Sequence, residues 1–320
     1  MSQPTMPAAP VMGGNASAAA PTPVNNYQSS RRELSQHVHV GLWRSIRSEF
    51  VKLTSLKSTW ILLIINLLLL PAGAAMAAWT MKTVARLDLT TGDFSNHTRA
   101  IPAQAVWQSV TTFVGISTIV VGIFGVLSIT TEFTSSSVDA SLTANPHRNM
   151  MLAAKAIVVA AFSWCFSQLG ILLSWAIVRL QLSGVEILSL DHAYKALPWV
   201  SIIGAPLISV GFAVMAVGVG ALCRSTVGAV FTLIGIDFFL PAIISIFSIA
   251  MRYVTWIGTL SKLMPTQLMS TFLAAGSSSG EDISAKSFDP LWWQAGLLFL
   301  VWVVAFYAIG AVLLEKRDIK

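Results

Sequence analysis

The chain has 320 residues, of which 55% are hydrophobic and 11% are charged, and its mean hydropathy is +0.71. Soluble domains carry about 25% charged residues, so this composition excludes an ordinary soluble domain and indicates an integral membrane protein. The formal net charge of +6 does not require a nucleic-acid partner, because membrane proteins gather Lys and Arg on their cytoplasmic side. We therefore expect the chain to contact a lipid bilayer and no nucleic acid.

The N-terminal part of the chain divides into two segments. Residues 1–30 contain no Asp, Glu, Lys or Arg, and such a segment buries too little apolar surface to offset the entropy of ordering, so we expect a disordered tail. In residues 31–59 apolar side chains recur at the three- and four-residue spacing of one helix face. A basic amphipathic helix directly before a span is predicted to lie in the cytoplasmic headgroup plane. The alternative is a helical extension of the first span.

Apolar stretches long enough to cross a bilayer follow. A membrane-spanning helix needs about 20 mostly apolar residues, and six stretches qualify: 60–79, 105–129, 151–178, 197–222, 227–250 and 291–314. The predicted fold is an all-α membrane protein, with residues 60–320 forming a domain of six transmembrane helices. Lys and Arg are more numerous on the side that carries both termini, which predicts that both termini are cytoplasmic.

Motifs for ATP binding and for zinc catalysis are missing from the sequence. It contains no G-x-x-x-x-G-K-[ST] loop for ATP phosphates and no H-E-x-x-H zinc motif. We therefore expect no catalytic residue, no metal site and no cofactor in this chain, which is not expected to be an enzyme.

A few polar residues inside the spans are candidates for a substrate path. Asp237 is an acidic residue well inside the fifth span, with Pro241 four residues later. Burying a carboxylate in a membrane is costly, so Asp237 either lines a path or takes up protons, or it makes a structural hydrogen bond. Ser167 and Gln168 in the third span either line a cavity or, as we favour, bond between helices. The candidate path residues are Asp237, Gln168 and Ser167.

The fourth span carries a stripe of small residues. Gly204, Gly211 and Gly218 recur every seven residues, and such stripes let helices approach closely. Packing within the chain is favoured over a seam between two copies.

The segment between the second and third spans has a compact pattern. It reads G-V-L-S-I-T-T-E-F-T-S-S-S-V-D-A-S-L-T-A-N-P-H-R-N-M-M-L-A-A-K, from Gly125 to Lys155. Glu132 ends the span, residues up to Leu142 can form a short helix, and Pro146 turns the chain ahead of Arg148. This element is either an ordinary loop or a projection that docks into a partner's groove.

Two stretches together resemble a known family. They are the segment just quoted and S-E-F-V-K-L-T-S-L-K-S-T-W, from Ser48 to Trp60. With six spans and cytoplasmic termini, the chain resembles, over roughly residues 31–320, the permease subunits of type-2 ATP-binding-cassette (ABC) exporters in their actinobacterial form. Relatives usually carry a Gly and a basic residue near Ser136 and Asp139, so the corresponding surface of this chain is more acidic.

The resemblance implies a function and partners. The chain would form the substrate path of an exporter in the cell membrane, with a second permease copy and a separate cytoplasmic ATPase that holds the ATP and Mg²⁺. The amphipathic helix and the loop after the second span, as coupling helix, would contact this ATPase. The residues that would carry this contact are Glu132, Phe133, Leu142, Pro146, Arg148, Glu49 and Lys52.

Two other functions compete with this reading. One is a proton-coupled secondary transporter that uses Asp237 and needs no soluble partner. The other is a membrane sensor or assembly subunit without transport activity. An apolar path fits a hydrophobic drug, a lipid or an amphipathic peptide equally well.

Overall fold

The computed structural model describes residues 41–87, 94, 98–134, 148–250, 255–276 and 288–316. The predicted disordered tail, residues 31–40 of the predicted amphipathic helix and the predicted coupling helix lie outside these residues. Within the described part the chain is almost wholly helical. Its sheet consists of the parallel pair β1 (Ile101–Pro102) and β2 (Ile187–Leu188).

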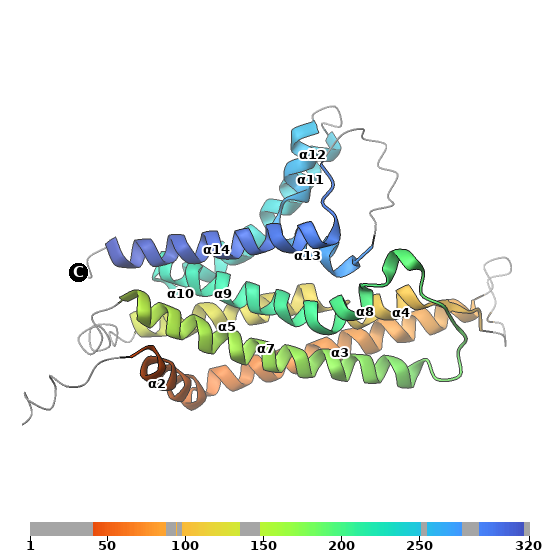
Figure 1. Ribbon diagram of the computed structural model, residues 1–320, viewed down its shortest axis with the longest axis horizontal. Coiled ribbons are helices and arrows are strands. Elements are labelled where there is room, and N and C mark those ends of the chain that lie inside the picture. Colours follow the sequence, from red (N-terminus) through yellow and green to blue (C-terminus); the bar gives the residue numbers. More distant parts are fainter. Residues whose placement is uncertain are drawn as a thin grey trace, which may run out of the picture. The chain divides into compact units, whose positions relative to one another are not determined.

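The α-helices, which Figure 1 labels, and three short η segments follow one another along the chain. They are α2 (Leu42–Ser55), α3 (Lys57–Arg86), α4 (Ala103–Val110), α5 (Val114–Thr134), α7 (Arg148–Gln181), the 3₁₀ turn η1 (His192–Tyr194), α8 (Leu197–Trp199), the π-helical segment η2 (Val200–Gly204), α9 (Ala205–Cys223), α10 (Thr226–Ile234), the π-helical segment η3 (Gly235–Phe239), α11 (Leu240–Ala250), α12 (Thr255–Lys262), α13 (Pro265–Ala274) and α14 (Trp292–Lys316).

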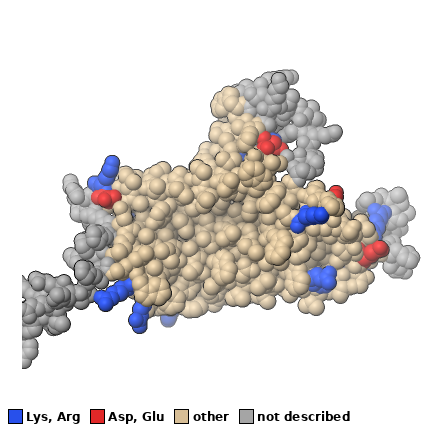
Figure 2. Space-filling view, in the orientation of Figure 1, with Lys and Arg blue, Asp and Glu red and all other residues tan. Residues whose placement is uncertain are grey.

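The prediction of an all-α fold with six spans is confirmed. Among the described residues, six helical stretches are long and apolar enough to cross a membrane: Lys57–Arg86, Ala103–Phe133, Asn149–Gln181, His192–Cys223, Thr226–Ser248 and Trp292–Lys316. On the face drawn in Figure 2, charged side chains gather towards the ends of the helices, and a broad uncharged region separates them. These features are consistent with a multi-pass membrane protein.

The fourth span forms the centre of the helix packing. Helix α9 lies against α5, α7 and α14, and α3 packs against α7 (Figure 1). The fourth span is the most buried of the six and the fifth is the least buried. Apolar side chains on the fifth span therefore face away from the protein more than those of any other span.

The glycine stripe of the fourth span packs within the chain, as predicted. A Cβ atom on Gly211 would lie 2.5 Å from the Phe299 ring, and one on Gly218 would lie 2.5 Å from the carbonyl oxygen of Phe306. Both neighbours belong to α14, so hydrogen in place of a side chain allows α9 and α14 to touch. Gly204 faces Phe272 of α13 in the same way.

Helix α2 packs against the bundle through part of its predicted apolar stripe. Leu53 is buried, Ile46 packs against the core, and the Phe50 ring stacks on Phe162 of α7 with centroids 5.3 Å apart. Leu42, at the start of the helix, is exposed. Between Ile46 and Leu53 on the inner face lies Glu49, which the apolar pattern did not include.

Candidate functional site

An ion-pair cluster of four side chains joins three helices that are distant in sequence. Its members are Glu49 and Lys52 of α2, Glu132 near the end of α5, and Lys155 near the start of α7. Lys155 is its centre, because its Nζ donates to Glu49 Oε2 at 2.5 Å and to Glu132 Oε1 at 3.0 Å. The Nζ of Lys52 closes the cluster by donating to Glu49 Oε1 at 2.8 Å and to Glu132 Oε1 at 3.1 Å.

Most of the ion-pair cluster is buried, and its four members in the described part of the chain carry two positive and two negative charges. Lys155 is 1% exposed and Glu49 is 3% exposed, while Lys52 reaches the cluster from the surface. A charge removed from water carries a penalty of several kcal/mol, which is offset only when partners supply both opposite charge and hydrogen bonds. Two ammonium groups and two carboxylates meet this condition here. Removing any one member would leave the others with an uncompensated buried charge.

The pKa values of the two α2 members follow from this arrangement. Burial by itself would raise the pKa of Glu49, but the charge and hydrogen bond of Lys155, helped by those of Lys52, hold the pKa below its ordinary value. Burial by itself would lower the pKa of Lys52, but its hydrogen bonds and attraction to Glu49 and Glu132 raise the pKa above its ordinary value. Both groups are therefore charged at neutral pH.

The structure brings together three of the predicted coupling residues and adds a fourth. Glu49, Lys52 and Glu132 meet in the cluster, whereas Lys155 was not among the predicted site residues. Its signal in the sequence was a lysine inside an otherwise apolar stretch at the end of the second motif. Which carboxylates it would pair with could not be read from the sequence, because they lie on other helices.

The structure describes two of the other four predicted coupling residues. Phe133 is partly buried against the core, and the guanidinium carbon of Arg224 lies 5.8 Å from the centroid of its ring. Arg148 begins α7. Leu142 and Pro146 lie outside the described residues.

The predicted substrate-path residues divide between two helix packings. Ser167 belongs to a buried network in which Asn66 Nδ2 donates to Ser167 Oγ at 3.1 Å and Ser117 Oγ donates to Asn66 Oδ1 at 2.5 Å. This network joins α3, α5 and α7. Gln168, next to Ser167 on α7, is partly exposed. Asp237 lies instead in η3, which packs against α10, α11 and α13.

Asp237 has unusual surroundings for a carboxylate. It is 2% exposed, and neither of its side-chain oxygens has a hydrogen-bond partner among the described residues. The structural hydrogen bond that the sequence left open as an alternative is therefore not formed within the described part. A π-helical segment such as η3 is rare and often marks a functional position.

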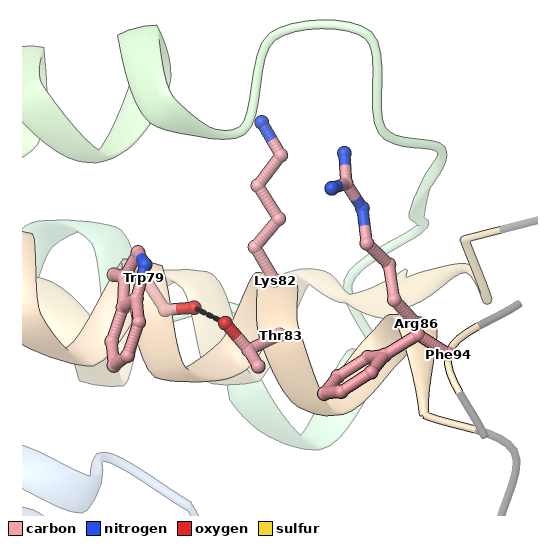
Figure 3. Close-up of a pocket in the computed structure, with 5 residues that line it drawn as sticks. All are labelled: Trp79, Lys82, Thr83, Arg86 and Phe94. Carbon is pink, nitrogen blue, oxygen red and sulfur yellow. Dashed lines mark hydrogen bonds between the residues drawn. The ribbon is translucent and has the colours of Figure 1, made fainter. Parts of the chain in front are cut away.

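A cavity of about 340 Å³ opens beside the C-terminal half of α3. Its lining residues are Trp79, Lys82, Thr83, Arg86 and Phe94. Figure 3 shows the Lys82 and Arg86 side chains extending on the same side of α3. The Nζ of Lys82 donates to the carbonyl oxygen of Gln181 at 2.8 Å, so this side chain also ties α3 to the end of α7.

Comparisons with known proteins give no name to this arrangement. No family model matches the sequence, and no curated protein is significantly similar to it. Among the described residues, no group of three or more His, Cys, Asp and Glu side chains is placed to hold a metal ion. Any functional assignment must therefore come from the ion-pair cluster, from Asp237 and from the motifs of the sequence.

Proposed function

We propose that this chain is the membrane-spanning permease subunit of a type-2 ABC exporter, driven by a separate cytoplasmic ATPase. The observation that supports the proposal is the ion-pair cluster. Its α2 members come from the first motif of the family resemblance, and its other two members come from the second motif. The two sequence segments that carry the family resemblance are therefore in direct contact in the ion-pair cluster.

The position of the cluster suggests how movement would pass into the membrane. The cluster joins α2 to the end of α5 and to the start of α7, the helices on either side of residues 135–147. In the proposed complex these residues carry the coupling helix, with Leu142 as an anchor in a groove of the ATPase. A displacement of this segment by the ATPase would move α2, α5 and α7 together. A change in the packing of rigid helices is a general route for conformational switching.

The remaining parts of the proposal concern location and partners. Both termini and the segment 135–147 lie in the cytoplasm, the protein resides in the cell membrane, and a second permease copy completes the path. ATP and Mg²⁺ are bound by the ATPase, for which the gene beside that of this chain is the first candidate. That gene should encode a G-x-x-x-x-G-K-[ST] loop.

The proposal is tested by co-purification of the permease with this ATPase. Interfaces gain most of their energy from a few buried anchors, so Leu142→Asp should release the ATPase while the spans remain inserted. The matched control is Leu188→Asp, because Leu188 is exposed and lies in β2, far along the chain from the coupling segment. ATPase recovery that is equal for wild type and Leu142→Asp, or the absence of any ATPase bound to the wild type, contradicts the proposal.

A second candidate function is proton-coupled transport through Asp237. It is favoured by one observation, the buried carboxylate without a hydrogen-bond partner among the described residues. The two functions differ in their energy source. Proteoliposomes that contain this chain alone, and that accumulate ethidium when only a pH gradient is imposed, would favour the second candidate.

A further inference from the structure

The carboxylate of Asp237 has no counter-charge on the described helices that pack most closely around it. Segment η3 contacts α10, α11 and α13. None of these helices contains a Lys, Arg, His, Asp or Glu, and Asp237 is the single titratable side chain of η3. Both carboxylate oxygens also lack hydrogen-bond partners among the described residues. The described part of the site therefore offers this carboxyl group neither a counter-charge nor a hydrogen bond.

The local backbone and its neighbours add little that could donate to this carboxylate. Pro241 has no N–H, so it cannot donate to the carbonyl group of Asp237 four residues earlier. Thr266 Oγ1, on the packed helix α13, belongs to a hydroxyl that could donate, but this buried oxygen has no hydrogen-bond partner among the described residues and so is not bonded to Asp237. An ionised side chain in a membrane span is usually paired with an opposite charge.

The exposed face of the span that carries Asp237 is aromatic and open to the bilayer. Phe238 and Phe239 follow it directly and are exposed, as is Phe231 earlier in the same span. The span that carries them is the least buried of the six. Aromatic faces attract cations, and apolar rings also accept the hydrophobic body of a membrane-dissolved compound.

We infer that Asp237 recognises the positive charge of a hydrophobic organic cation that reaches the fifth span from the bilayer. This inference rests on the proposed export function and names the class of compound exported. In the state described here the carboxylate is covered, so binding requires a change of conformation that uncovers it. An anion would be repelled, and a neutral compound would leave the carboxylate unpaired.

The test uses two probes of nearly the same size and shape but opposite charge, tetraphenylphosphonium and tetraphenylborate. The full chain is placed in nanodiscs of zwitterionic phosphatidylcholine, and binding to empty discs is subtracted. We expect tetraphenylphosphonium to bind and tetraphenylborate not to bind. In Asp237→Asn, which keeps the shape and removes the charge, phosphonium affinity should fall by about tenfold or more, the loss expected for one charge contact. Asp237→Glu should retain most of the affinity.

The effect of pH gives an independent readout. A proton competes with the cation for the same carboxylate, and α10, α11 and α13 offer no other titratable group. Phosphonium binding should therefore weaken as pH falls in wild type, and the same pH change should have no effect in Asp237→Asn.

Three outcomes would overturn the inference: tetraphenylborate binding to wild type as well as the phosphonium does, unchanged phosphonium affinity in Asp237→Asn, or wild-type binding that does not depend on pH. The first and third need only the wild type, so they decide the matter even if a variant fails to fold. The assay contains no ATPase. A negative result therefore removes the cation site and leaves the proposed coupling to be judged by co-purification.

Discussion

The Nζ atom of Lys155 lies 2.5 Å from Oε2 of Glu49, although the two residues are 106 positions apart in the chain. This contact fixes α2 against the start of α7 at a buried point. It also explains why a lysine is tolerated in an otherwise apolar helix, since two carboxylates surround its ammonium group.

Replacing the central lysine should destabilise the protein strongly. Lys155→Met leaves two carboxylates facing one remaining ammonium group, and losing one partner of a buried ion pair costs about 3–5 kcal/mol. The double variant Lys155→Met with Glu49→Gln restores charge balance and should recover part of the loss. Thermal unfolding in detergent measures both, with Lys57→Met as the control, because Lys57 is exposed. Equal unfolding temperatures for wild type and Lys155→Met would show that the cluster does not stabilise α2.

The two α2 members of the cluster should stabilise the fold over a wide pH range. The pKa of Glu49 is lowered in the folded protein, so its contribution is present above the ordinary pKa of 4.5 and is lost as pH falls through the folded value. The pKa of Lys52 is raised, so its contribution is present below the ordinary pKa of 10.5 and is lost as pH rises through the folded value. The measurement is the unfolding temperature as a function of pH. In Glu49→Gln the unfolding temperature should fall less at acidic pH than it does in wild type. An equal fall in both proteins would contradict the stabilising role of the Glu49 carboxylate.

The hydrogen bond between Asn66 and Ser167 should contribute a small but measurable stability. Ser167→Ala removes the acceptor for Asn66 Nδ2, and interhelical bonds in membranes contribute about 0.6 kcal/mol on average and up to about 1.7 kcal/mol. Ser163→Ala is a matched control, because Ser163 lies one turn away on α7 and is buried, but its Oγ has no hydrogen-bond partner among the described residues. Equal losses in the two variants would show that the bond adds nothing.

Adding one methyl group between α9 and α14 should separate these helices. A Cβ on Gly218 would lie 2.5 Å from the Phe306 carbonyl oxygen, and backbone atoms cannot move aside as a side chain can. Gly218→Ala is therefore expected to destabilise by about 1–3 kcal/mol. In Gly235→Ala the new methyl group meets no atom within 4 Å, so this variant serves as control. A Gly218→Ala protein as stable as Gly235→Ala would exclude close α9–α14 contact.

The proposed orientation predicts which loops an impermeant thiol reagent reaches. In a background without Cys165 and Cys223, a cysteine placed within residues 277–284 should be labelled from outside intact cells. A cysteine within 136–144 should be labelled only after the cells are opened. Both segments lie outside the described residues. The labelling pattern therefore tests the orientation of the chain across the membrane and not the structure of these loops. The reverse pattern would place the termini outside the cell.

Several features could be predicted from the sequence because they depend on local composition. Long apolar runs identified the six spans, and the seven-residue spacing of Gly204, Gly211 and Gly218 identified a face for close packing. The stripe of α2 was predicted in part, since Ile46 and Leu53 face the bundle while Leu42 does not. An apolar residue next to a membrane can face either protein or lipid, and periodicity does not separate these two environments.

The sequence by itself determined that this chain is an all-α membrane protein, because the hydrophobic effect acts on each apolar run wherever its neighbours lie. Tertiary structure alone decided that Lys155 pairs with Glu49 and Glu132, and that Asp237 has no such partner among the described residues. A charge in a membrane span must be compensated or kept neutral, but the compensating group usually lies on another helix. Its identity depends on which helices meet, and no local pattern records that.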